Sequence, residues 1–301
     1  MKPASSPDEK VHWAELRPDD FRARFARRPV VYLPLGLCEP HGHVAALGLD
    51  LIKAEFYCAE AARRFGGIVA PSQGYHIHEC GFHAPWLAEV VGEENAMMAA
   101  IPPHVMAHLF LYQLRAFALA GFRAVIAISG HSGGSQEDLR RVAAAFTTAT
   151  GIPVTVKSDP EWIPRLHGGD HAGRYEISQL LAMRPDLVDL SLLRRAQEPG
   201  SGGRLAVGED AGEADVAYGR TINEAIIAAM GEVAAQVAPG PAVVKPAQLT
   251  YAVTEKIWSD VIATLPAWIS VAPKPGQAPA PAGSRWKVQE RVADVLARTQ
   301  S

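Results

Sequence analysis

The sequence predicts an α/β protein with three layers (α/β/α), in which a mainly parallel sheet carries helices on both faces. Short apolar segments rich in strand-forming residues alternate along the chain with longer segments of helical periodicity. Such alternation is typical of βαβ units, which build parallel sheets. The length of 301 residues suits one large domain with a buried core better than two independent domains.

Four segments carry the strand signal, which is an apolar run bounded by glycine, proline or polar residues. The first reads VVYLPLG and ends at a glycine, and the third reads RAVIAIS. We expect strands at residues 30–36, 67–72, 123–129 and 153–158.

Longer segments carry helical signals, and a short polar helix is expected before residue 28. Two glycines end the segment that begins at Asp50, and Pro102 with Pro103 begins the next, as is typical of a first helical turn. Ser135, followed three residues on by Asp138, resembles a capping box. We expect helices at residues 50–65, 102–120, 135–150, 173–183 and 215–237.

Composition excludes several classes of protein. The net charge is -3 and there is no basic stripe, so nucleic-acid binding has no electrostatic support. No apolar run is long enough to cross a bilayer. The N-terminal residues carry charges and prolines where a signal peptide requires an apolar stretch. We therefore expect a cytoplasmic protein that acts on a small-molecule substrate, with neither nucleic acid nor membrane as a partner.

Residues 1–271 are expected to form a single catalytic domain. The segment APKPGQAPAPAGS, at 272–284, is rich in proline, alanine and glycine and lacks core-forming residues. The stretch RWKVQERVADVLART that follows it has the pattern of an amphipathic helix. We expect residues 272–301 to be a proline-rich linker followed by a C-terminal helix.

The first chemical signature, EPHGH at residues 39–43, follows the first predicted strand. Carboxylate and imidazole together suit Zn, Mn or Fe. Gly42 permits a tight turn that directs Glu39 and His41 to the same point. Asp50 begins the next predicted helix, whose N-terminus stabilises its charge, and a carboxylate there is placed to bridge two cations.

A second signature, SGHSGGS at residues 129–135, joins the third predicted strand to a helix. A glycine-rich turn before a helix also suits a phosphate group. However, the glycine spacing matches neither GxGxxG nor a P-loop, and His131 at its centre favours a metal ligand. Ligands of parallel sheets bind at the carboxyl ends of the strands, where residues 39–41 and His131 all fall.

A third signature, GDHAGRYE at residues 169–176, leads into another predicted helix. Taken alone, Glu176 is best interpreted as a solvated carboxylate on a helix surface, because most glutamates are exposed. Its interpretation changes only when the three signatures are considered together.

In this order, the three signatures resemble those of the creatininase (creatinine amidohydrolase) family. That family has a Glu-x-His-Gly turn with an Asp eleven residues after the Glu, matched here by Glu39, His41, Gly42 and Asp50. Its second signature, an Asn-Gly-His-Gly-Gly-Asn-like turn, is matched loosely at 129–134. Its third, His-Ala/Gly-Gly-x-x-Glu-Thr-Ser, is matched at 171–178. The resemblance spans roughly residues 30–240 and implies a creatininase-like fold.

The resemblance implies two divalent metal ions per subunit, Zn or Mn, with Fe as a further candidate. Asp50 would bridge the two ions. Glu39 and His131 would complete one position, and His41 and Glu176 would complete the other.

The resemblance also assigns a proton-handling role to His171, which lies behind the metal ligands with Asp170 near it. From their adjacency, we expect Asp170 to orient or tune the imidazole of His171. Members of the family assemble as ring-like homo-oligomers, so we expect a homo-oligomer, with a hexamer as one form.

Several positions depart from the family pattern. Val44 stands where the family has a second histidine, and Ser129 and Ser135 stand in place of the asparagines that flank the glycine turn. The family's Gly-Thr-Ile segment is replaced by HIHECGFHAPW at residues 76–86. Because the metal positions are kept while the substrate-facing positions differ, we expect a substrate other than creatinine.

The histidines of this replaced segment, His76, His78 and His83, form a cluster of their own. A third metal site, a substrate-binding wall and plain loop residues are three interpretations, of which the last two are favoured about equally. We expect substrate contacts from His78, Glu79, His83, Trp86 and Tyr175.

The predicted function is that of a dinuclear metal-dependent hydrolase, in which a metal-bound hydroxide attacks a carbonyl of a small cyclic amide-like substrate. One alternative is a hydrolase that opens a C–C bond in a cyclic polyol ketone of the inosose type, and another is a formamide deformylase. An isomerase with one metal and a histidine base is a further rival. The alternative outside enzymes is a catalytically inactive scaffold of the same fold, against which the intact set of five metal positions argues.

Overall fold

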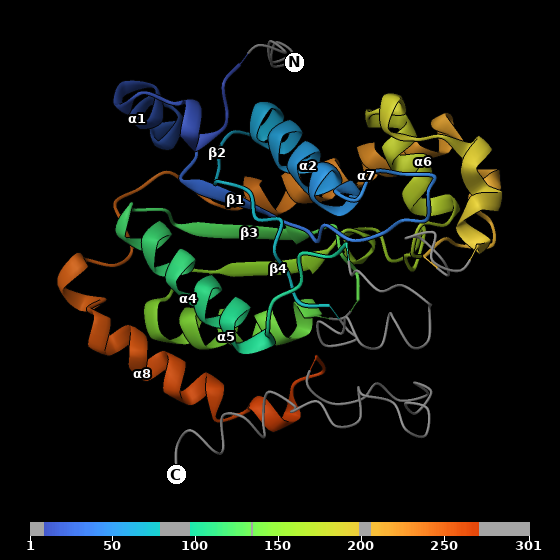
Figure 1. Ribbon diagram of the computed structural model, residues 1–301. Helices are drawn as coiled ribbons and strands as arrows, with labels where there is room; N and C mark the ends of the chain where they lie inside the picture. The colour runs from blue at the N-terminus through green and yellow to red at the C-terminus, as the bar shows by residue number, and fades with distance from the viewer. Residues whose placement is uncertain (1–8, 79–96, 134, 199–205, 271–301) are drawn as a thin grey trace.

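The computed structural model describes residues 9–78, 97–133, 135–198 and 206–270. Its centre is a four-stranded sheet with the order β2-β1-β3-β4 (Figure 1). All three pairs of neighbouring strands are parallel, as predicted. The strands are β1 (Val30–Leu35), β2 (Ile68–Val69), β3 (Ala124–Ser129) and β4 (Val154–Ser158).

The edge strand β2 is shorter than the sequence predicts. Pairing with β1 is regular only at Ile68 and Val69. Pro71 has no N–H to donate to a neighbouring strand, and the chain meets β1 again only at Gln73, through an isolated bridge with Leu35.

The predicted helices form within a few residues of their expected ends. Proline begins α1 and α4, and Asp215 caps α7 by accepting a hydrogen bond from the Tyr218 amide. These helices are α1 (Pro18–Arg27), α2 (Leu49–Phe65), α4 (Pro103–Leu119), α5 (Ser135–Thr150), α6 (Arg174–Met183) and α7 (Val216–Ala235). Short 3-10 helices lie at Trp13–Glu15, Pro160–Trp162, Pro185–Leu187, Leu190–Gln197, Ala211–Glu213, Pro246–Gln248 and Leu265–Ala267.

Helices cover both faces of the sheet, which confirms the predicted three-layer α/β/α fold (Figure 1). Alternate residues of a strand point to opposite faces. Val31 and Leu33 of β1 therefore pack in the cluster of α4 and α5, whereas Val30 and Tyr32 pack in the cluster of α2 and α7. All six residues of β1 are buried, as expected for a central strand with both faces covered.

Helix α8 (Tyr251–Ile262) was not predicted from the sequence. It packs outside α4 and α5 and buries Ile257 and Val261 against them. Thr250 caps it, because its hydroxyl accepts a hydrogen bond from the Val253 amide.

Asp138 corrects the capping-box prediction for α5. Its fully buried carboxylate accepts hydrogen bonds from the backbone amides of Ile269 and Ser270 and from the Ser270 hydroxyl. It therefore anchors the chain that follows α8 and does not complete a capping box with Ser135.

The described part of the chain ends at residue 270, so the predicted linker and C-terminal helix at 272–301 lie outside the described residues. Among the helices of the described residues, none has both the length and the apolar character needed to traverse a membrane.

Candidate metal centre

The predicted metal ligands all come from the carboxyl-terminal edge of the sheet or from helix starts beside it. Glu39 and His41 follow β1, and His131 follows β3. Asp50 lies in the first turn of α2, and Glu176 lies in the first turn of α6. All five residues are at most 4% exposed.

Two glycines let the start of α2 lie against the strand ends. A Cβ atom on Gly130 would lie 2.0 Å from the backbone oxygen of Asp50, and one on Gly36 would lie 2.4 Å from the Leu51 nitrogen. Any side chain at either position would push the helix away. Gly42 has a φ of 60°, the left-handed conformation expected of the turn that joins Glu39 to the residues after His41.

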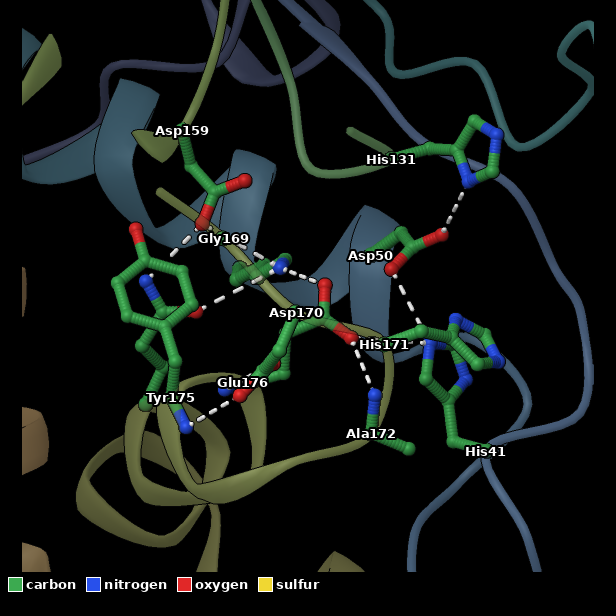
Figure 2. A network of polar contacts seen from close by, with 12 residues as sticks. His41, Asp50, His131, Asp159, Gly169, Asp170, His171, Ala172, Tyr175 and Glu176 are labelled. Atoms are coloured by element: carbon green, nitrogen blue, oxygen red, sulfur yellow. Dashed lines mark hydrogen bonds and ion pairs between the residues drawn. The ribbon is translucent and has the colours of Figure 1, made fainter. Parts of the chain in front are cut away.

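Asp50 lies between two imidazoles, as Figure 2 shows. Its Oδ1 atom is 3.2 Å from Nε2 of His41, and its Oδ2 atom is 3.5 Å from Nδ1 of His131. Each carboxylate oxygen thus faces a different histidine, which is the arrangement that a carboxylate shared by two cations requires.

The remaining two acids, Glu39 and Glu176, each lie close to one of these imidazoles. Nδ1 of His131 is 2.8 Å from Oε1 of Glu39, and Nε2 of His41 is 3.7 Å from Oε2 of Glu176. Ligand atoms compatible with a metal ion therefore gather in one group of Glu39, Asp50 and His131 and a second of His41, Asp50 and Glu176. These are the two groups that the sequence resemblance implies.

The buried donor set fits divalent cations. His41 Nε2 and Asp50 Oδ2 are buried and form no hydrogen bond among the described residues. His41 Nδ1 lies 3.0 Å from the backbone oxygen of Glu39 and can donate to it, which leaves Nε2 as the ligand atom. Buried polar atoms without partners are costly, and Zn or Mn prefers such imidazole and carboxylate donors.

The same contacts shift the pKa values of the cluster. Burial alone would raise the pKa of Glu39, but the His131 imidazole outweighs it and lowers this pKa to about 2. Burial alone would lower the pKa of His41, but the Asp50 carboxylate raises it to about 9. Asp50 itself is held well below its usual pKa by His41, against the effect of burial. Without a metal, these contacts thus favour ionised Glu39 and Asp50 and a protonated His41.

His171 lies at the edge of this cluster, and its side chain is 43% exposed. Its Nδ1 atom is 3.9 Å from Oε1 of Glu39, and its Nε2 atom is 3.1 Å from the backbone oxygen of Pro40. Its ring centroid is 4.9 Å from that of His41. A third group of possible ligand atoms, Glu39, His41 and His171, follows from this position.

Asp170 does not orient His171 in the way that their adjacency led us to expect. Its carboxylate accepts hydrogen bonds from the backbone amides of Tyr175 and Glu176, at 2.8 and 3.2 Å. It thereby satisfies free amides in the first turn of α6. Burial and the neighbouring Glu176 carboxylate raise the pKa of Asp170.

His76 and His78 flank His131, with ring centroids 5.7 and 5.9 Å from it. Nε2 of His78 is also 3.3 Å from Oε2 of Glu39, so His78 adjoins the cluster. Burial and the nearby His131 lower the pKa of His76 to about 4. Glu79, His83 and Trp86 lie outside the described residues.

Tyr175 was predicted to contact substrate, but the structure places it in the core. It is 0% exposed and packs in the cluster formed with α2 and α7. Its ring stacks on that of His167 at 4.3 Å between centroids. The residue on α6 that reaches the cluster is its neighbour Glu176, whose Oε2 atom lies 3.7 Å from Nε2 of His41.

Two further charged residues behind the cluster were not identified from the sequence. Lys53 lies one turn after Asp50 on α2, and Asp159 directly follows β4; both side chains are 0% exposed. Burial raises the pKa of Asp159 to about 6, although the ammonium group of Lys53 opposes that rise. Two features of the sequence could have identified these residues. Lys53 follows Asp50 by three positions on the same helix face, and Asp159 lies at the end of another strand.

Comparisons with known proteins agree with the fold. The creatinine amidohydrolase of Pseudomonas putida is 28% identical over 206 residues, which cover 60% of this chain and 75% of that protein. A solved structure named Creatininase Mn has a TM-score of 0.60 and 22% identity, over 75% of this chain and 97% of its own.

A putative creatinine amidohydrolase from Bacteroides fragilis has a TM-score of 0.56 and 17% identity, over 75% of this chain and 96% of its own. At such identities, the solved structures show a shared fold. The model of the creatininase family, described as creatinine amidohydrolase, matches residues 14–269. The chain therefore belongs to the creatininase family of hydrolases.

Proposed function

We propose that this chain is a dinuclear metal-dependent hydrolase that cleaves a small cyclic amide-like substrate other than creatinine. The observation that carries the proposal is the position of Asp50, whose two oxygens face His41 and His131 separately. Family membership supports hydrolysis. Among the relatives, one solved structure is named Creatininase Mn and another is a creatininase variant of the Zn-Zn type.

The two cation positions would be held by residues of this chain in a buried site. Glu39, Asp50 and His131 would hold one cation, and His41, Asp50 and Glu176 would hold the other. When bound, such cations lower the pKa of a coordinated water to about 7 and polarise a carbonyl.

His171 is placed to move a proton at this site. Its ring is the most exposed part of the cluster, and its Nδ1 atom faces Glu39. An imidazole can accept a proton on one ring nitrogen and donate a proton from the other. It would take a proton from the attacking water and deliver it to the leaving nitrogen.

A cleft of about 670 Å³ lies beside the turn that follows His131, and none of the five candidate metal ligands lines it. Ser132 and Gly133 line one side of it, and His167 and Gly168 line another. The size suits a small molecule. Its polar side chains are Ser132, Gln136, Glu137, Ser158, Glu161 and His167.

These polar walls support a second candidate, a hydrolase that opens a C–C bond in a cyclic polyol ketone. Hydroxyl groups of such a ring could form hydrogen bonds with the polar side chains of the cleft. A flat apolar ring would leave those side chains without hydrogen-bond partners. The two candidates share the metal centre and differ only in the bond that is broken.

A substrate screen tests the proposal. The protein would be stripped with a chelator, reloaded with Mn or Zn, and incubated with lactams, formamides, creatinine and cyclic polyol ketones. Hydrolysis adds the mass of one water to the substrate, whereas isomerisation adds nothing, so mass spectrometry separates these classes. Activity that survives complete metal removal would contradict the proposal, as would turnover of creatinine above every other substrate.

A further inference from the structure

Among the described residues, Lys53 is the only fully buried lysine, and it lies directly behind the candidate metal centre. It follows Asp50 by three positions on α2, so both side chains leave the helix on the same face. A buried ammonium group is costly unless charged groups surround it. The groups around the Lys53 ammonium therefore indicate its role.

The partners of Lys53 are two acids and one amide. Its Nζ atom lies 2.5 Å from Oε1 of Glu176, 3.3 Å from Oδ2 of Asp159 and 3.5 Å from Oε1 of Gln179. Asp159 also accepts a hydrogen bond from Nε2 of Gln179 at 3.0 Å. One cation is thus shared between two buried carboxylates, of which only Glu176 belongs to the metal centre.

Lys53 leaves Glu176 with a single oxygen for a metal. Oε1 is occupied by Lys53, while Oε2 accepts a hydrogen bond from the Ala172 amide and lies 3.7 Å from Nε2 of His41. The cation position formed by His41, Asp50 and Glu176 therefore has a fixed positive charge directly behind one of its acids.

Within the described part of the chain, Glu39 of the other cation position has no ammonium group as a partner. Among the described residues, the ion pairs of Glu39 are all with histidines, namely His78, His131 and His171. An imidazole can itself coordinate a metal ion, whereas an ammonium group can only repel it. The two positions therefore differ in their electrostatic field, although both share Asp50.

We propose that the buried pair of Lys53 and Asp159 sets the affinity of the cation position formed by His41, Asp50 and Glu176, with Lys53 weakening it and Asp159 strengthening it. Lys53 is in this sense a positioning residue that acts through Glu176. The inference rests on the proposed dinuclear site and adds an order to it: this position is the weaker of the two and is filled last.

Opposite charges at Lys53 and Asp159 predict opposite effects of their removal. Lys53→Met should tighten binding of the second cation by roughly tenfold or more, because charge–charge repulsion is strong at short range in a buried site. Asp159→Asn should weaken binding of the second cation by a similar factor, since the positive charge of Lys53 would then be neutralised only by Glu176. The double variant Lys53→Met/Asp159→Asn should return to within about threefold of the wild type. A purely structural role would weaken binding in both single variants.

The experiment is a titration of the metal-free protein with Mn²⁺, in which free Mn²⁺ is counted by electron paramagnetic resonance. Circular dichroism would first establish that each variant is folded. Lys256→Met is a matched control, because Lys256 is an exposed lysine that pairs with Asp260 on α8. It removes the same charge and should leave both binding steps unchanged.

An unchanged or weaker second step in folded Lys53→Met would overturn the inference while leaving the dinuclear site intact. If Lys53→Met does not fold, Asp159→Asn decides alone, and unchanged or tighter binding there overturns the inference. A wild-type protein that binds fewer than two Mn²⁺ ions would instead refute the dinuclear site, and the inference with it.

Discussion

Nδ1 of His131 lies 2.8 Å from Oε1 of Glu39, although the two residues are 92 positions apart in the chain. They meet because β1 and β3 are parallel neighbours in which Leu35 pairs with Ser129. Both strands therefore end at the same edge, and the residues just beyond them share one site. The metal centre is thus a consequence of strand order and register.

Replacing Gly130 by alanine should damage both the fold and the metal centre. The new Cβ atom would lie 2.0 Å from the Asp50 backbone oxygen, so the first turn of α2 would have to move. We expect a loss of about 1–3 kcal/mol in the free energy of unfolding and weaker metal binding, measured by denaturant unfolding and metal analysis. Gly168→Ala is the control, since nothing lies within 4 Å of a Cβ atom there. Equal stability of the two variants would contradict this view of Gly130.

Replacing His171 by alanine should strongly reduce turnover without removing metal. The expected fall in kcat is roughly 100-fold to 10,000-fold, the range for loss of a general acid or base. His108→Ala, which removes a partly exposed histidine between α4 and α8, should leave kcat unchanged. A loss of bound metal in His171→Ala would show instead that His171 is a ligand, in the group it forms with Glu39 and His41.

Metal binding should release a proton from His41. The Asp50 carboxylate outweighs the effect of burial and raises the pKa of His41 to about 9 in the metal-free chain, so its ring is protonated at neutral pH. A cation that binds Nε2 must displace that proton. Apparent affinity should therefore rise by up to about tenfold per pH unit as the pH increases from 7 towards 9, and level off above it. Calorimetry in buffers of different ionisation enthalpy counts the released proton, and an affinity that stays flat across this range would contradict the assignment.

The sequence predicted those parts of the molecule that depend on local pattern. The apolar runs predicted β1 and β3, and glycines and prolines predicted the ends of α2 and α4. Because Glu39 and His131 directly follow predicted strands, they could be placed at the same edge of the sheet. The grouping of Glu39 with His131 and of His41 with Glu176 came from resemblance to a family, because no local pattern relates residues so far apart.

Features that depend on tertiary contacts were not predictable from pattern. Lys53 and Asp159 are buried charges, and only the folded structure shows that Asp159, just after β4, lies 3.3 Å from the Lys53 ammonium group on α2. Asp170 was assigned to its sequence neighbour His171, but the free amides of α6 attract its carboxylate more strongly. Helix α8 was not predicted either, and its position depends on Ile257 and Val261, which pack against α4 and α5.

The central claim is that the carboxylate of Asp50 is shared by two cations. Its most direct test is the metal content of the purified protein and of Asp50→Ala, measured by plasma mass spectrometry after reloading and removal of excess metal. We predict two equivalents per chain in the wild type and fewer than one in the variant. Two equivalents retained in folded Asp50→Ala, or none in the wild type, would contradict the account.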